Sequence, residues 1–168
     1  HVSSITLYNV LKLLHIFAAI GFAGGISARQ IVRMYANATD DVTRFATLNQ
    51  AAMHIENWMV KPGSFVILAL GIALAWRGGL PMLGVLQGEN QNWLLVSNVL
   101  FVFGMALVPT VFLPRGKRFR VVLDAALAQR RVTPELRTAL NDPVVRAAHA
   151  YEYLMLIVIT ALMTLKPF

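Results

Sequence analysis

The sequence predicts an all-α integral membrane protein, a four-helix bundle in which a cytoplasmic basic helical loop joins the third and fourth spans. Of its 168 residues, 57% are hydrophobic and only 14% are charged, against about 25% charged in an ordinary soluble domain. Apolar runs of about 20 residues, the length that crosses a bilayer, recur along the chain. Four such runs fill about half of it, so we expect a single transmembrane domain over residues 1–168.

The four spans are expected at residues of about 5–33, 55–76, 92–113 and 143–166. The first follows a Ser3-Ser4 capping signal and is too long for a secretory signal peptide. The second is entered through an interfacial or kinked turn at Pro62. The third is stopped by Pro114, and the fourth opens with Pro143, a residue that suits the first turn of a helix.

The distribution of Lys and Arg predicts the orientation of the chain. Segments 29–61 and 115–146 are rich in these residues, whereas the loop between the second and third spans holds only Arg77. We therefore expect the two basic segments in the cytoplasm and both termini in the periplasm of a bacterial inner (plasma) membrane. The lipid bilayer is the expected partner. Nucleic acid is not, because the basic residues flank the spans and form no stacking platform.

Ionisable side chains inside a span are candidates for function, because each costs several kcal/mol unless it faces the bundle interior. At 100° per residue, the charged residues of the first span share one stripe. They are Lys12, His15, Arg29 and Arg33. Gly21 and Gly25 form a small-xxx-small pair at another azimuth, where a second backbone can approach closely.

Two further spans carry a histidine each. On the fourth, Arg146 and His149 share a stripe. Glu152 lies one turn beyond His149, where it can fix the tautomer of the imidazole or pair with a cation. On the second, His54 lies on the same side as Lys61. Three histidines, one on each of three helices, are therefore expected to face inward.

Inward imidazoles, basic residues and aromatics in a small helical bundle indicate a haem b. Imidazoles ligate the iron, Arg and Lys neutralise the propionates, and apolar rings wrap the macrocycle. Copper or zinc would also accept three histidines, but the arginines have no role in such a site. The chain has no cysteine, which excludes iron–sulfur clusters and covalently attached haem. The expected ligands are His15, His149 and His54, and the expected further contacts are Lys12, Arg29, Arg33 and Arg146.

The depths of the histidines limit which of them can share one iron. With a rise of 1.5 Å per residue, His54 and His149 differ in depth by about 7 Å, and His15 and His149 by about 12 Å. The first pair is tolerable for a bis-histidine haem, and the second requires the helices to slide or tilt. Two separate sites, or one haem held by His15 and a partner other than histidine, remain open.

Several short motifs resemble the haem-binding protoporphyrinogen IX oxidase of bacterial membranes, the HemJ type. The resemblance covers about two thirds of the chain, mostly its first two spans. The chain as a whole is similar to a broad family of small four-helix predicted integral membrane proteins of unknown function, distant relatives of that oxidase and of CopD membrane domains. The motifs are Lys12-x-x-His15-Ile16, Gly21-Phe22-Ala23-Gly24, Arg29-x-x-x-Arg33, Pro62-Gly63, Gly71-Ile72, Arg146-Ala-Ala and Lys166-Pro167-Phe168.

The resemblance implies that His15 is an axial haem ligand and that Arg29 lies near the cytoplasmic side of the cofactor. The chain departs from the oxidase in the third span, where Ser97-Asn98 replaces an essential lysine, and in the final helix, where His149 stands near the Asn of an Asn-Glu pair. These departures count against porphyrinogen oxidation. Haem binding is less affected, because another inward histidine could replace a lost ligand.

Three functions follow as hypotheses. The first is a haem b protein with an electron-transfer or HemJ-like oxidoreductase role. The alternative is a cofactor-free structural or assembly subunit of a larger membrane complex, respiratory or photosynthetic, or of a homo-oligomer, with Gly21 and Gly25 as its docking face. The third is copper or proton transport along Lys12, His15, Glu152 and His149. The chain contains no motif of a soluble enzyme.

Overall fold

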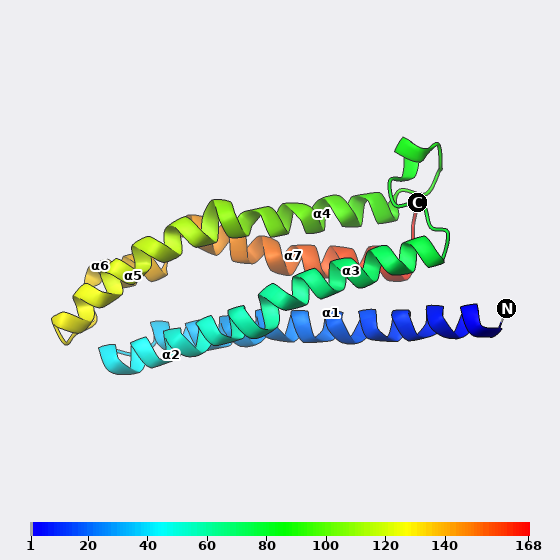
Figure 1. Cartoon of the computed structure of the whole chain (residues 1–168). Coiled ribbons are helices and arrows are strands. Elements are labelled where there is room, and N and C mark those ends of the chain that lie inside the picture. The colour runs from blue at the N-terminus through cyan, green and yellow to red at the C-terminus, as the bar shows by residue number, and fades with distance from the viewer. Residues whose placement is uncertain (1) are drawn as a thin grey trace.

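The computed structural model describes residues 2–168, with side chains from Thr6 onward, and this part of the chain is helical and contains no strand (Figure 1). The α-helices are α1 (Val2–Asn37), α2 (Val42–Ile55), α3 (Lys61–Arg77), α4 (Trp93–Leu107), α5 (Leu113–Ala128), α6 (Pro134–Leu140) and α7 (Pro143–Leu165). Two short π-helical segments, η1 (Glu56–Val60) and η3 (Val108–Phe112), and a 3-10 turn, η2 (Gly84–Gln87), complete the fold.

The prediction of an all-α chain with four long apolar helices is confirmed. Segments long and apolar enough to cross a membrane are Thr6–Asn37, Val42–Arg77, Trp93–Ala128 and Pro134–Leu165. Each exceeds the roughly 20 residues that a bilayer requires. The helices extend beyond the expected spans, because α2 and α5 lengthen the second and third helices with amphipathic turns and α6 lies directly before α7.

The four long segments pair into two antiparallel hairpins. In the first, α1 packs along α2, η1 and α3, and in the second α4 packs along α7 while α5 packs against α6. Figure 1 shows the two hairpins as separate layers, with α1 and α3 in one and α4 and α7 in the other. The hairpins meet at their basic ends, where α2 contacts α5, and also in a buried apolar core that brings Phe22 of α1 against Phe101 of α4 and Met155 of α7.

Neither Pro62 nor Pro114 ends a helix, which corrects the expected stop at Pro114 and leaves a bend within a continuous helix at Pro62. Each lies two residues after a π-helical segment, and the helix continues beyond it to Arg77 or Ala128. A proline removes the donor to the carbonyl four residues earlier, and its ring crowds that carbonyl. A wider π-helical turn accommodates both effects, so the chain bends without breaking.

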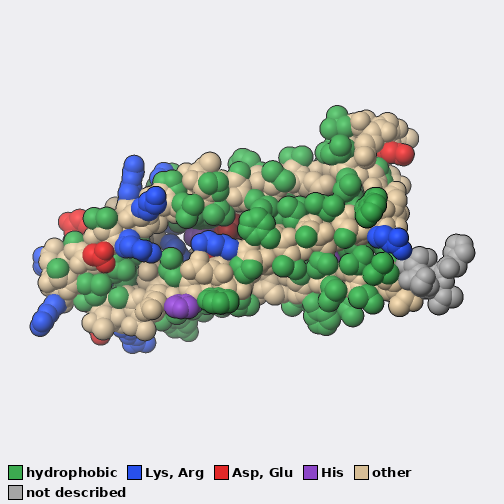
Figure 2. Space-filling view, viewed as in Figure 1, with side chains coloured by type: hydrophobic (Ala, Val, Ile, Leu, Met, Phe, Trp, Pro, Cys, Tyr) green, Lys and Arg blue, Asp and Glu red, His purple; other side chains and the backbone are tan. Residues whose placement is uncertain are grey.

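The basic end of the bundle has a small core of its own. Phe45 of α2 and Leu136 of α6 are fully buried there, packed with Leu123 and Ala126 of α5. The expected basic loop is thus two packed helices, α5 and α6. Figure 2 shows lysines and arginines gathered at this end and hydrophobic side chains over most of the remaining surface.

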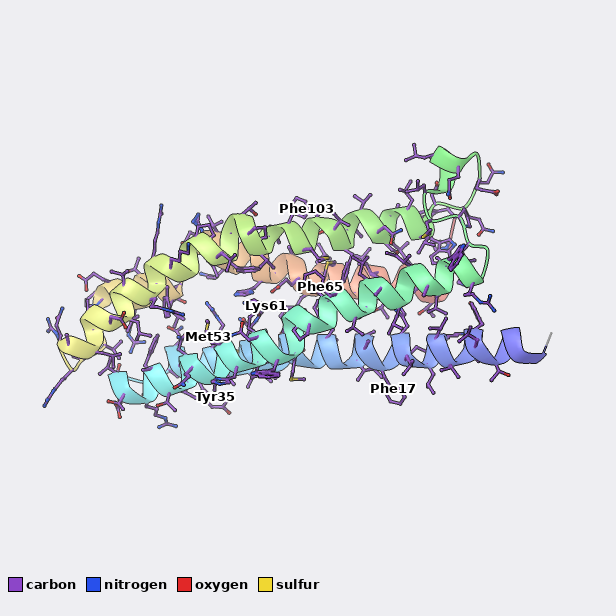
Figure 3. All side chains as sticks on the ribbon, in the orientation of Figure 1. Phe17, Tyr35, Met53, Lys61, Phe65 and Phe103 are labelled. Atoms are coloured by element: carbon purple, nitrogen blue, oxygen red, sulfur yellow. The ribbon has the colours of Figure 1, made fainter. Side chains whose placement is uncertain are left out.

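Large apolar side chains point away from the bundle, as a lipid-facing surface requires. Phe17 of α1 and Phe103 of α4 project outward in Figure 3 and are 63% and 55% exposed. Trp58, in η1, and Trp76, near the end of α3, are more exposed still. Tryptophan is enriched at both membrane–water interfaces, so these two residues are where we expect the apolar band to end.

The opposite end is closed by the C-terminus. The backbone N–H groups of Asn92 and Trp93 donate to the Phe168 carbonyl at 3.0 and 3.1 Å, which satisfies two donors at the start of α4. Trp93 is buried here with Ala75 of α3 and Leu162 of α7. This contact ties the second hairpin to the end of the first.

Candidate functional site

A buried polar cluster around Arg29 lies between the two hairpins. The Arg29 guanidinium forms ion pairs with the carboxylates of Glu56 and Glu152. Its Nη2 atom lies 3.1 Å from Nδ1 of His149, which in turn lies 2.8 Å from Oε2 of Glu152. Arg29 is only 5% exposed, and His149 and Glu152 are 7% exposed. We refer to these four residues together with Phe112 as the Arg29 cluster.

The helices explain why these side chains meet. His149 and Glu152 are three residues apart on α7, so they share a face. Glu56 opens η1, and Phe112 closes η3. The Phe112 ring stacks on His149 with centroids 4.8 Å apart, and the Arg29 guanidinium lies 6.0 Å from its centroid. Both π-helical segments therefore supply the cluster, in keeping with the frequent occurrence of such segments at functional sites.

The charge balance of the cluster ties the hairpins together. One guanidinium faces two carboxylates, one from each hairpin, in a nearly water-free place. A buried ion pair is costly to break, because the partner left behind is an uncompensated charge worth about 3–5 kcal/mol. The Arg29 cluster therefore fixes the spacing of the two hairpins. Below we call this cluster, with the same five residues, the clasp.

A cavity of about 650 Å³ lies on the side of the clasp toward the C-terminus, walled by α1, α3, α4 and α7. We call it the His15 cavity. Its wall is mostly apolar and includes Phe22, Phe101 and Trp93, with Ser97 and Asn98 as polar members. Among its lining residues there is no Asp or Glu.

His15 is the histidine of this cavity. Its Nδ1 atom is buried and forms no hydrogen bond of regular geometry among the described residues, although the imidazole lies within reach of the Ile67 backbone of α3. The ring faces the α3 backbone at Gly71, where a Cβ atom would stand 3.3 Å from its Cε1. Lys12 and Lys166 line the same cavity, and the Lys166 ammonium lies 5.2 Å from the Trp93 ring centroid. The cavity thus combines an imidazole, two cations and an apolar wall.

A second, smaller pocket of about 260 Å³ lies on the other side of the clasp, toward the basic end. We call it the Arg33 pocket. It opens between α1 and α7 near the turn that joins α6 to α7. Its polar lining residues are Gln30, Arg33, Asn37, Asn141, Arg146, His149 and Tyr153.

The residues singled out from the sequence lie at different locations in the structure. The charged stripe of α1 faces inward as predicted, but Lys12 and His15 line the His15 cavity whereas Arg33 lines the Arg33 pocket. Arg29 lies in the clasp between the two. His149 belongs to the clasp and also lines the Arg33 pocket, and Arg146 lies at that pocket.

The expectation that His54 faces the interior is wrong. Its side chain is exposed, and Nδ1 lies 3.1 Å from the Gln50 carbonyl of its own helix. Ala52 is on the buried face of α2. His54 follows two residues later, and at 100° of rotation per residue it lies on the opposite side of the helix. The three histidines consequently do not converge, and among the side chains described, from Thr6 to Phe168, no group of three His, Cys, Asp or Glu residues could hold a metal ion.

Sequence reasoning missed two members of the clasp. Glu56 is an acidic residue within the second span, which alone makes it a candidate. The prediction for this span nevertheless rests on His54 and Lys61. Phe112 carries no charge, and nothing in its spacing marks it. By contrast, the expected pairing of Glu152 with a cation is confirmed at Arg29, and its carboxylate lies 2.8 Å from Nδ1 of His149.

Of the two paired glycines of α1, only Gly25 is in close contact with another helical segment of the chain. A Cβ at Gly25 would stand 3.0 Å from Met59 Cβ and 3.2 Å from Val60 Cγ2, so η1 approaches α1 there. A Cβ at Gly21 would meet nothing within 4 Å. The close approach predicted for the pair is therefore found at Gly25.

Four lipid-length helices, an apolar exterior and a buried ion pair between the hairpins define a multi-pass integral membrane protein. The family model described as predicted integral membrane protein (DUF2269) matches residues 9–167. The chain belongs to this family. Neither the curated proteins nor the solved structures gave a match.

Proposed function

We propose that the His15 cavity binds a haem b, with His15 as its axial ligand, and that the protein transfers electrons in the membrane. The observation that carries the proposal is an imidazole whose buried nitrogen forms no hydrogen bond of regular geometry, in the wall of a 650 Å³ apolar cavity. A bound haem supplies an iron that accepts and donates one electron. The chain supplies the ligand, the apolar surroundings and the counter-charges.

The dimensions of the two cavities favour this location. Cofactor sites usually enclose about 300–1,000 Å³, and the His15 cavity lies within that range while the Arg33 pocket, at about 260 Å³, lies below it. His149 is also held by Glu152 and Arg29 and covered by Phe112. We therefore assign the macrocycle to His15 and not to His149.

The charges of the cavity suit a ligand with two carboxylates. Lys12 and Lys166 line the wall without any acidic lining residue to neutralise them. Haem propionates would pair with these ammonium groups, while Phe22, Phe101 and Trp93 would contact the ring. The arginines predicted to serve the propionates are elsewhere, since Arg29 is engaged by two carboxylates.

Simple electron transfer suits this cavity better than oxidation of a porphyrinogen. Such an oxidation requires a group that removes protons and hydride equivalents beside the substrate, and Ser97 and Asn98 are the polar residues that α4 brings to the cavity. Neither is a base at neutral pH. No second histidine lines the cavity among the described residues, so we propose that His15 is the sole histidine ligand.

The absorption spectrum of the purified protein tests the proposal. The protein is produced in cells supplied with a haem precursor, and reduced-minus-oxidised spectra are recorded for the wild type, His15→Ala and His54→Ala. We expect a Soret band in the wild type and in His54→Ala, whose side chain is exposed, and its loss in His15→Ala. Added imidazole should restore the band in His15→Ala by filling the space of the missing ring.

Two results would overturn the proposal. One is a colourless wild-type protein from haem-replete cells, which would favour a cofactor-free subunit. The other is a His15→Ala protein that keeps a full Soret band, which would place the haem at another ligand.

A further inference from the structure

We infer that the Arg33 pocket is a second site, which binds a phosphate group through Arg33, Arg146 and His149. The pocket lies beyond the clasp from the His15 cavity, and its lining residues are not shared with that cavity. The inference therefore does not depend on haem binding. Its ligand is identified by chemistry alone, and either a phospholipid headgroup or a soluble phosphate could supply it.

The lining of the pocket selects an anion. Two guanidinium groups, those of Arg33 and Arg146, line it together with amides and an imidazole, and no lining residue is Asp or Glu. Arg146 forms no ion pair with any described residue, and Arg33 donates to the Leu140 carbonyl at 3.5 Å, the outer limit of a hydrogen bond. Both guanidinium groups therefore have donors to spare, and arginine is the residue best suited to phosphate.

The clasp and the Arg33 pocket together carry a net positive charge. Glu56 and Glu152 are bound by Arg29 and do not line the pocket. Counting these two carboxylates against Arg29, Arg33 and Arg146 leaves one positive charge, with His149 taken as neutral. A phosphate group in the pocket would compensate that charge.

Two buried polar atoms of the lining residues lack a partner. They are Nε2 of His149 and Oε1 of Gln30, and both residues line the pocket. A buried polar atom without a hydrogen bond is unfavourable, which indicates that a ligand group completes them. A phosphate oxygen can accept a hydrogen bond from a protonated Nε2, and a phosphate O–H can donate one to an unprotonated Nε2, so the group suits either tautomer. A rotated Gln30 amide would present its N–H₂ to the same phosphate.

The volume of the pocket limits the ligand to a small group. At about 260 Å³ it falls below the range for drug-sized molecules, so it suits a phosphate with few attached atoms. Met34 lines the pocket and is 65% exposed beside it. Because α1 presents this apolar side chain to the surroundings, acyl chains of a lipid could lie outside while the headgroup enters.

Two binding measurements on delipidated, detergent-purified protein test the inference and separate the sources. Calorimetric titration with inorganic phosphate reports a soluble ligand, and native mass spectrometry with added phosphatidylglycerol counts retained lipid. The test variant is Arg33→Gln/Arg146→Gln. Its matched control is Arg118→Gln/Arg120→Gln, which removes the same charge from exposed positions of α5.

Loss of two charged donors should weaken binding at least about tenfold in the test variant and leave the control unchanged. Should the double arginine variant fail to fold, Ala150→Glu is compared with Ala150→Gln. Ala150 is an exposed lining residue, so the carboxylate repels an anion while the amide of the same shape does not.

Each outcome decides the matter. Phosphate binding that falls in the test variants supports a soluble ligand, and lipid retention that falls without phosphate binding supports a headgroup. The inference is overturned if neither ligand binds, or if the test variants bind as well as their controls. Because neither measurement uses the Soret band, a failure here is distinct from a failure of the haem proposal.

Discussion

At the scale of single residues, Arg29 links the two hairpins through its buried ion pairs. Its planar guanidinium has five donors in a fixed arrangement, and it pairs with carboxylates from both hairpins while contacting His149. A lysine in its place would have one compact charge and three donors, without this planar geometry. The clasp therefore depends on arginine specifically.

Replacing Arg29 by Gln should destabilise the protein by about 3–5 kcal/mol, because two buried carboxylates lose their counter-charge. Reversible unfolding in mixed detergent micelles measures the change. Arg44→Gln is the control, since Arg44 is exposed on α2 and should change stability by less than about 0.5 kcal/mol. Equal stability of the two variants would show that the clasp does not hold the hairpins.

A second residue-scale prediction concerns Gly71. A side chain there would crowd the His15 ring, because even a Cβ would stand 3.3 Å from Cε1. Gly71→Leu should therefore lower the haem content of the purified protein several-fold, whereas Gly21→Leu, where nothing lies within 4 Å, should not. The Soret absorbance per protein measures both. Full haem content in Gly71→Leu would count against the assignment to His15.

The sequence predicts the residues of one helix better than their partners on another. The face shared by His149 and Glu152 follows from their spacing on α7, and the inward stripe of α1 follows in the same way. The periodicity of polar and apolar residues along one helix does not determine how that helix is rotated relative to its neighbours. For that reason the sequence predicts an inward His54, which is wrong, and gives no role to Glu56.

At the scale of elements, the two π-helical segments set the course of both long central helices. Each precedes a proline, Pro62 or Pro114, and each contributes one residue to the clasp. A proline in the sequence predicts a break in the helix. Whether the helix ends there or continues through a π-helical turn depends on how it packs against its neighbours. Here η1 packs on α1 and η3 packs near α7, which favours continuation.

The close packing of η1 on α1 gives a prediction for adjacent glycines. Gly25→Ala should destabilise by about 1–3 kcal/mol, because its Cβ would overlap the Met59 and Val60 side chains. Gly24→Ala should be neutral or stabilise by up to about 1 kcal/mol through helix propensity, since a Cβ there meets nothing. The same unfolding assay compares them. A Gly25→Ala variant as stable as Gly24→Ala would contradict this packing.

At the scale of the whole molecule, two hairpins joined by a polar clasp enclose one cavity on each side of it. Composition and length were enough to predict four apolar helices. The division into hairpins and the gap between them were not predictable, because they depend on which helices pack tightly. In place of the expected pocket shared by three histidines, the structure has two cavities with different lining residues.

The orientation of the molecule in the membrane is a prediction that cysteine labelling can test, because the chain has no native cysteine. Glu89→Cys lies in the exposed loop before α4, and Gln129→Cys lies at the end of α5. The basic segments predict that a membrane-impermeant maleimide labels Glu89→Cys in intact cells and Gln129→Cys only after lysis. The reverse pattern would invert the predicted topology.

The position of iron in crystals of haem-replete protein tests the central claim most directly. Anomalous diffraction at the iron absorption edge locates the metal without reference to a spectrum. We expect one iron in the cavity between the hairpins, about 2 Å from an imidazole nitrogen of His15. Iron bound at His149, or crystals of the haem-replete protein without any iron between the hairpins, would contradict the account.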